Sequence, residues 1–307
     1  MERRGLLHAG TALAATALTT TVASPAHAAR RRPTFVLVHG ANGNGYSFAP
    51  LAAELALAGF GAVPVDLPGH GPAANYPASY QSPQDLAAFA DAPSPTLAGT
   101  ALADNADHVA GIVRRAAAHG PVILLGQSMG GATVTLAADR VPGLITRLVY
   151  LSAFCCTAFR SVADAFGSPE AAGSLLGDIP PVGDPARTGV LRTNWRAAEV
   201  VAPAKAALAA DYDEAAFGAV LNGFEPDEAA AVATDDARGD RRRWGRVPRT
   251  YVRFTADRAI PLALQDRMIA DADAATPGNR FTVHSLRAPH LGPQDAAVLM
   301  DVLAGLA

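Results

Sequence analysis

The chain has 307 residues, of which 50% are hydrophobic and 17% are charged, and its formal net charge is −3. This length fits one large or two ordinary domains, and the apolar fraction excludes an intrinsically disordered chain. The near-neutral charge argues against nucleic-acid binding as the main function, and two cysteines are too few for a disulfide framework.

The first 28 residues read as an export signal rather than as part of the fold. Arg3-Arg4 precede an apolar run over 5–23, and Ala26-His27-Ala28 fits the small-x-small pattern of a cleavage site. We therefore expect cleavage after Ala28 and secretion. The arginine pair favours the twin-arginine route, with a Sec signal as the alternative. Several threonines make the run a poor permanent membrane span.

After a linker over 29–33, the chain alternates apolar strands with helices, which predicts one α/β domain over 34–307. Continuous apolar runs are typical of strands buried on both faces, and the alternation predicts a mostly parallel, doubly wound sheet built from βαβ units. The expected strands are 34–38, 61–67, 122–125, 145–152, 251–255 and 281–286. The expected helices are 48–58, 102–118, 130–139, 262–272 and about 294 to the end.

Two segments break this rhythm. Residues 72–99 carry five prolines and form a long irregular insertion, and such loops are often lids. Residues 154–244 are rich in alanine and hold no strong strand. We expect this second segment to be a helical cap inserted between two strands of the sheet.

A nucleophile-elbow motif lies near the middle of the chain. Gly126-Gln127-Ser128-Met129-Gly130 matches G-x-S-x-G, follows the expected strand 122–125 and opens the expected helix 130–139. Glycines fit the flanking positions because the strand-to-helix turn is too sharp for side chains. The turn would present Ser128 at the carboxyl edge of the sheet, where open parallel sheets bind ligands, so we expect Ser128 to be a nucleophile.

A serine nucleophile needs a base and an orienting acid, which follow a G-x-S-x-G elbow in the order acid, then histidine. Only His284 and His290 come after Ser128. His284 lies inside an expected strand, whereas His290 lies in the loop that follows this strand, so His290 is the expected base. Asp257 ends the preceding strand and is the expected acid. The carboxylates on the next helix are expected to be solvated charges.

Acyl transfer also needs N–H donors for the tetrahedral oxyanion. We expect one from Met129, directly after the nucleophile, and one from Ala41, in the loop after the first strand. His39 ends that strand and is expected to organise the loop by hydrogen bonding rather than to act as a base. Asp66 and His70 are expected to stabilise the turn after the second strand in the same way.

These residues make the chain similar to the α/β-hydrolase superfamily over nearly all of 34–307. Asp257 followed by Ile260-Pro261, Gln265 and Met268-Ile269 resembles the branch that holds plant methyl esterases and hydroxynitrile lyases. Members of that branch hydrolyse small carboxylic esters or cleave cyanohydrins, and the resemblance implies neither metal nor cofactor. All but one of the 25 basic residues are arginines, which is typical of GC-rich actinomycete coding and indicates an actinomycete-type exported hydrolase.

Two positions help to separate the two activities of this branch. The lyases typically carry Thr after the strand-end histidine and Lys after the histidine base, whereas this chain has Gly40 and Leu291. Without that lysine nothing obvious stabilises a cyanide leaving group, so the resemblance favours ester hydrolysis. Gln127 stands where histidine is frequent in the elbow, and the cap has no close match, so the substrate stays open.

The implied reaction is a two-step acyl transfer. His290 accepts the proton of Ser128, Asp257 orients the imidazolium, and water then releases the acid. The expected partner is a small-molecule ester, with no nucleic acid and no stable membrane anchor, and the oligomeric state stays open. The alternative is a lactonase, thioesterase or C–C bond hydrolase with the same triad. A ligand-binding protein on a hydrolase fold is a further class, which the intact triad disfavours.

Two cysteines and three aromatic residues of the cap admit more than one interpretation. Cys155-Cys156 follow the expected strand 145–152, near the rim of the predicted site. We prefer reduced, partly buried thiols to a strained vicinal disulfide, although an exported protein meets oxidising conditions. In the cap, Trp195, Phe217 and Phe224 line either an apolar pocket or ordinary core.

Overall fold

The computed structural model describes residues 32–307, so the predicted export signal over 1–28 lies outside the described residues. A six-stranded sheet runs in the order β2-β1-β3-β4-β7-β8, and every neighbouring pair is parallel. The predicted mostly parallel, doubly wound sheet is therefore confirmed. Its strands are β1 (Thr34–Val38), β2 (Gly61–Val65), β3 (Val122–Ser128), β4 (Arg147–Ala153), β7 (Arg249–Phe254) and β8 (Thr282–Leu286).

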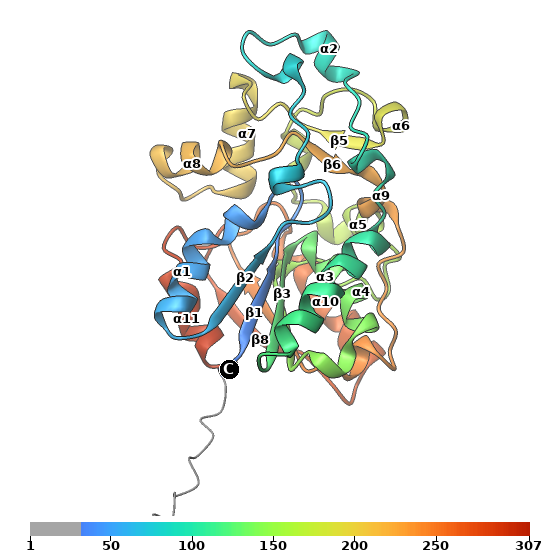
Figure 1. Ribbon diagram of the computed structural model, residues 1–307, viewed down its shortest axis with the longest axis vertical. Helices are drawn as coiled ribbons and strands as arrows, with labels where there is room; N and C mark the ends of the chain where they lie inside the picture. The colour runs from blue at the N-terminus through green and yellow to red at the C-terminus, as the bar shows by residue number, and fades with distance from the viewer. Residues whose placement is uncertain (1–31) are drawn as a thin grey trace, which may run out of the picture. The chain divides into compact units, whose positions relative to one another are not determined.

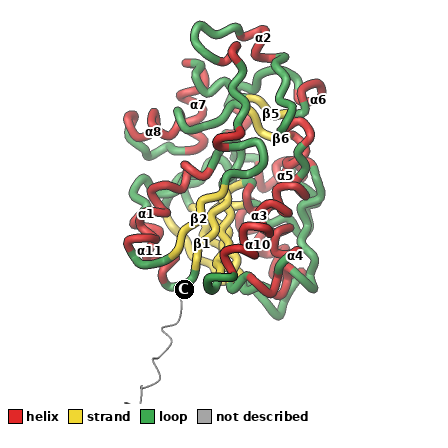
Figure 2. The backbone as a smooth tube through the Cα atoms, in the orientation of Figure 1, coloured by secondary structure: helices red, strands yellow, loops and turns green. Residues whose placement is uncertain are grey.

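Helices cover both faces of this sheet (Figures 1 and 2). Alternate residues of a strand point to opposite faces, and in β1 both sets are apolar. Phe35 and Leu37 pack in one core cluster with α1 and α11, whereas Val36 and Val38 pack with α3 and α4 in another. This two-sided burial explains the unbroken apolar run. The helices are α1 (Ala49–Leu57), α3 (Leu102–Ala117), α4 (Gly130–Arg140), α10 (Leu262–Ala275) and α11 (Ala297–Ala304).

Most elements lie where the sequence predicted them, but β3 is longer than expected. Its pairing with β4 continues past Leu125 through Gly126 and Gln127 and ends in an irregularity at Ser128. The polar end of this strand carries no apolar signal, because it leaves the core at the carboxyl edge of the sheet. Within residues 32–307, no helix is both long and apolar enough to cross a membrane.

The 72–99 insertion and residues 154–234, which make up most of the segment between β4 and β7, lie above the carboxyl ends of the strands (Figure 1). The insertion holds single 3-10 turns and one short helix, α2 (Leu86–Ala90). The second segment contains five helices and two short antiparallel strands. These are α5 (Val162–Phe166), α6 (Pro185–Thr188), β5 (Val190–Arg192), α7 (Ala198–Leu208), α8 (Glu214–Leu221), β6 (Asp227–Ala229) and α9 (Ala230–Thr234).

The sequence did not predict β5 and β6, because three-residue strands with charged residues carry no apolar run. A buried ion pair joins them. Arg192 and Asp227 face each other across the two strands, and two hydrogen bonds of 2.6 and 2.8 Å link the guanidinium to the carboxylate. Arg192 also donates to the carbonyl of Phe89 in α2 at 2.5 Å. The pair therefore ties the 72–99 insertion to the segment between β4 and β7.

Candidate active site

The turn that carries Ser128 is a strained, closely packed elbow between β3 and α4. Ser128 has a φ of 53°, a left-handed value that a non-glycine residue rarely adopts. A Cβ on Gly130 would lie 2.4 Å from the carbonyl oxygen of His39, and one on Gly40 would lie 2.6 Å from Cβ of Ser128. Glycines are therefore required for the loop after β1 to approach the serine so closely.

The structure brings the three residues of the predicted triad into contact. Nε2 of His290 lies 2.9 Å from Oγ of Ser128, and Nδ1 of His290 lies 2.7 Å from Oδ2 of Asp257. His290 and Asp257 are both buried. With the ring proton on Nδ1, the carboxylate accepts a hydrogen bond from this N–H, and Nε2 is left to accept a hydrogen bond from the serine hydroxyl. This tautomer is the one that a general base needs.

Asp257 accepts hydrogen bonds from more groups than the sequence predicted. Its Oδ1 accepts from the backbone N–H groups of Ala259 and Ile260, at 2.7 and 2.8 Å. Its Oδ2 accepts from Oγ of Ser152, at 2.5 Å, in addition to His290. Ser152 is the penultimate residue of the neighbouring strand β4, and the only signal in the sequence was a polar residue at the carboxyl edge of the sheet. These donors fix the position and orientation of the carboxylate.

Gln127 also contacts the histidine. Its Nε2 donates to the carbonyl oxygen of His290 at 3.1 Å and lies 3.4 Å from Nε2 of the same residue. In the sequence, Gln127 was notable only because histidine is frequent at this position of the elbow in the family that the chain resembles. The contact anchors the loop that carries His290 to the elbow itself.

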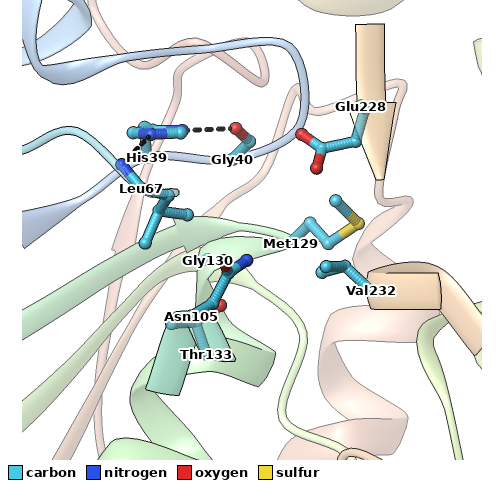
Figure 3. A pocket seen from close by; sticks show the side chains of 9 residues that line it. All are labelled: His39, Gly40, Leu67, Asn105, Met129, Gly130, Thr133, Glu228 and Val232. Carbon is cyan, nitrogen blue, oxygen red and sulfur yellow. Dashed lines mark hydrogen bonds between the residues drawn. The ribbon is translucent and has the colours of Figure 1, made fainter. Parts of the chain in front are cut away.

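The two residues expected to supply N–H groups for the oxyanion are Met129, which lines a small pocket, and Ala41, which directly follows the lining residue Gly40. Within residues 32–307, neither backbone N–H is held in a hydrogen bond by a loop, turn or side chain. Figure 3 shows the pocket, with Glu228 reaching from β6 toward Gly40. The pocket is lined by His39, Gly40, Leu67, Asn105, Met129, Gly130, Thr133, Glu228 and Val232.

The side chain of His39 holds the loop by hydrogen bonds and is not placed to act as a base. Its Nδ1 donates to the carbonyl of Gly40 at 2.8 Å, and its Nε2 accepts from the N–H of Leu67 at 3.2 Å. Burial and the nearby His70 lower the pKa of His39 to about 4, so the ring is neutral. Asp66 acts similarly, since its Oδ1 accepts from the N–H of Gly45 at 2.7 Å.

The remaining candidate residues make no hydrogen bond to the triad within residues 32–307. His284 lies within β8, opposite Val252 of β7. Cys155 and Cys156 are free and buried, and burial raises the pKa of the Cys155 thiol to about 12 and also raises that of Cys156. Both are therefore thiols rather than reactive thiolates at neutral pH.

The three aromatic residues of the cap pack against one another or against apolar neighbours. Trp195, Phe217 and Phe224 belong to one apolar cluster, with the Trp195 and Phe224 rings 4.7 Å apart. In the described part of the chain, no group of His, Cys, Asp and Glu is arranged to hold a metal ion.

A family model described as alpha/beta hydrolase family matches residues 35–300. The chain belongs to this family. No protein of curated function matches the hydrolase significantly. Among solved structures, a pyrethroid hydrolase from Sphingobium faniae is 22% identical over 89% of this chain and 96% of its own, with a TM-score of 0.68.

Two further structures have the same fold. An extracellular alpha/beta-hydrolase from a Paenibacillus species, described as sharing homology with tobacco salicylic acid binding protein 2, is 19% identical over 88% of this chain and 98% of its own, with a TM-score of 0.62. Polyneuridine aldehyde esterase is 18% identical over 89% of this chain and 99% of its own, with a TM-score of 0.64. At such identities the likeness establishes the fold, and the resemblance to the branch of plant esterases is confirmed at that level.

Proposed function

We propose that this hydrolase cleaves a carboxylic ester of a small molecule through an acyl-enzyme formed on Ser128. The observation that carries the proposal is the unbroken series of contacts from Oγ of Ser128 through both ring nitrogens of His290 to Oδ2 of Asp257. A serine hydroxyl is a weak nucleophile until a base within hydrogen-bond reach accepts its proton. Those distances suit this transfer.

The reaction has two steps. In the first, Oγ of Ser128 attacks the ester carbonyl while Nε2 of His290 accepts its proton, and the N–H groups of Ala41 and Met129 stabilise the oxyanion. His290 then donates that proton to the departing alcohol. In the second step, His290 takes a proton from water, the resulting hydroxide attacks the acyl-enzyme, and the acid leaves as Ser128 regains its proton. Asp257 stabilises the imidazolium in both steps.

Two considerations support an ester as the substrate. One structural neighbour is named as an esterase, polyneuridine aldehyde esterase, and another is named as a pyrethroid hydrolase. The chain also carries Gly40 and Leu291 where hydroxynitrile lyases typically carry Thr and Lys. Cleavage of lactones, thioesters or activated C–C bonds would use the same catalytic atoms. Attack on an acyl carbonyl is therefore common to the ester hypothesis and to these alternatives.

A panel of p-nitrophenyl esters from acetate to decanoate tests the proposal, with matched thioesters and lactones in parallel. We expect turnover of short esters by the intact enzyme and none by Ser128→Ala. A fluorophosphonate should add its mass to one site, and peptide mapping should locate it at Ser128. Turnover that survives in Ser128→Ala would overturn the proposal. Binding of the esters without turnover, equal in both proteins, would instead indicate a ligand-binding protein.

We also propose that the enzyme is exported, by the twin-arginine route, and cleaved after Ala28. The proposal rests on the Arg3-Arg4 pair, the apolar run and the small-residue site. The secreted protein should begin at Ala29 by intact mass. Replacement of both arginines by lysine should leave the protein in the cell, and unchanged secretion of that variant would contradict the twin-arginine route.

A further inference from the structure

Asn42, the neighbour of Ala41, ties the loop after β1 to the cap. Its backbone N–H donates to Oε2 of Glu228 at 3.0 Å, and its carbonyl accepts from the N–H of Glu225 at 2.8 Å. Its side-chain amide donates to the carbonyl of Glu225 at 2.9 Å. Asn42 thus directs its N–H, its carbonyl and its side chain at residues 225–228. Its φ of 57° is left-handed, which asparagine tolerates better than most residues.

The cap side of this contact is itself held in place. The carboxylate of Glu225 accepts from the N–H of Gly71 and from the side chain of Asn44, both at 2.8 Å, and contacts Nδ1 of His70 at 2.7 Å. The carbonyl of Glu225 also accepts from the indole N–H of Trp195 at 2.8 Å. Residues 225–228 therefore form a rigid surface against which the loop rests.

His70 supplies the positive charge for two buried carboxylates. Its Nδ1 lies 2.7 Å from Glu225 and its Nε2 lies 3.6 Å from Glu228. Burial alone would lower the pKa of His70, but the hydrogen bond to Glu225 and the nearby carboxylate of Glu228 outweigh it and raise the pKa to about 10. Burial likewise opposes ionisation of Glu228, yet His70 and the Asn42 N–H leave its pKa lowered. The other ring facing His70 is the neutral His39.

Other hydrogen bonds hold the flanks of the loop, from His39 to the carbonyl of Gly40 and from Gly45 to Asp66, but not the peptide groups of Ala41 and Asn42 between them. The turn at Ala41 and Asn42 is closed by one bond of 3.3 Å, from the N–H of Gly43 to the carbonyl of Gly40. Ala41 is exposed, and no loop or side-chain partner within residues 32–307 holds its N–H. A rotation of the peptide groups at this turn would therefore turn the Ala41 N–H away from the serine.

We propose that two cap residues, Glu225 and Glu228, position the loop after β1, acting through Asn42 to hold the Ala41 N–H toward the carbonyl under attack. Glu228 is a positioning residue, since it touches the loop and not the reacting atoms. The inference rests on the proposed function. It extends that function because the cap then contributes to the rate of the chemical step and not only to the shape of the substrate pocket.

Two substitutions of Glu228 test the inference with p-nitrophenyl butyrate as substrate. Glu228→Leu fills a similar volume, offers no acceptor to the Asn42 N–H and leaves little room for a water to replace it. Loss of one oxyanion donor costs about 10²–10³-fold in kcat, so a displaced donor should cost at least about tenfold, with KM changed less than about threefold. Glu228→Gln keeps an acceptor oxygen and should recover kcat to within about threefold of the intact enzyme.

Asp227→Asn is the matched control, because Asp227 is buried in the same strand but pairs with Arg192 and does not touch the loop. We expect it to lower the melting temperature while kcat of the folded protein stays within about twofold. If Asp227→Asn lowers kcat as much as Glu228→Leu does, the effect is general loosening of the cap and the inference is wrong. A folded Glu228→Leu protein with unchanged kcat would also overturn it.

Asn42→Gly decides the question if Glu228→Leu does not fold. Glycine accepts the left-handed φ of Asn42, so only the side-chain hydrogen bond to Glu225 is lost. We expect kcat about threefold to tenfold lower at unchanged KM, and an unchanged kcat would contradict the inference. Ser128→Ala distinguishes a failure of the proposed function from a failure of the positioning role. Turnover in that variant overturns the proposed function, whereas its inactivity beside unaffected Asn42 and Glu228 variants overturns only the positioning role.

Discussion

Ser152 donates a hydrogen bond of 2.5 Å to Oδ2 of Asp257, the same oxygen that contacts Nδ1 of His290 at 2.7 Å. One carboxylate oxygen thus accepts hydrogen bonds from both the Ser152 hydroxyl in β4 and the imidazole of the proposed base. Ser152 has a φ of 39°, so the chain accepts backbone strain at the residue that makes this contact. Strain of this kind concentrates at functional sites, and it singles out Ser152 as a residue that positions Asp257.

Ser152→Ala should therefore lower both stability and activity. Hydrogen bonds to charged groups contribute about 1.5–3 kcal/mol, and we expect a loss of that size in the free energy of unfolding measured with urea. A less firmly held Asp257 should lower kcat by about tenfold. Ser94→Ala is the matched control, because within residues 32–307 the buried Ser94 hydroxyl has no hydrogen-bond partner. Equal effects of the two substitutions would refute the assignment.

Gln127→Ala should reduce activity with little effect on stability. The side chain donates to the carbonyl of His290, and a hydrogen bond of this kind is worth about 1 kcal/mol, which corresponds to roughly a fivefold loss of kcat. Gln84→Ala, which removes contacts to Asn194 in the cap, should leave kcat unchanged. The kinetic constants for one p-nitrophenyl ester are sufficient for the comparison.

Ser128, His290 and Asp257 should behave as one unit in kinetics. Ser128→Ala and His290→Ala should each reduce kcat by about 10⁴-fold or more, and the double variant should be no slower than the worse single variant. This follows because the base has no role without the nucleophile it activates. The rates require active-site titration to exclude contaminating esterases. Multiplicative losses would show that the two residues act independently.

The Arg192–Asp227 pair should matter for stability in an asymmetric way. Removal of one partner of a buried ion pair typically costs about 3–5 kcal/mol, because it leaves a buried charge without its counter-ion. We expect such a loss in each single variant, Arg192→Met and Asp227→Leu. The double variant Arg192→Met, Asp227→Leu should recover most of it, since well-packed apolar residues can replace buried pairs. Urea unfolding of the four proteins forms the double-mutant cycle that checks this.

The His70 cluster should make stability fall at alkaline pH. The pKa of His70 in the folded protein is about 10, above the usual value of 6.5, so the folded state holds its proton more tightly than the unfolded state does. Its contribution is complete below pH 6.5 and decreases as pH rises toward 10. The free energy of unfolding should therefore drop between pH 7 and 10. His70→Gln should drop less steeply, and parallel curves would contradict this assignment.

The alternation of strands and helices could be predicted because each element has a local pattern of apolar residues. The runs over 35–38 and 122–125 are apolar at every position, a pattern typical of strands buried on both faces. The short strands β5 and β6 could not be predicted in this way. They are stabilised by pairing with each other and by the Arg192–Asp227 contact, which no window of neighbouring residues contains.

The sequence by itself determined which residues reach the carboxyl edge of the sheet. Ser128 ends a strand, Asp257 and His290 each follow one, and parallel strands bring their carboxyl ends to one edge, so chain order was enough to select them. Only the tertiary structure decided what surrounds them. Ser152 beside Asp257 and Glu228 beside Asn42 are contacts between residues far apart in the chain. A hydrogen bond depends on distance and angle in space, and those arise from how the cap packs on the sheet.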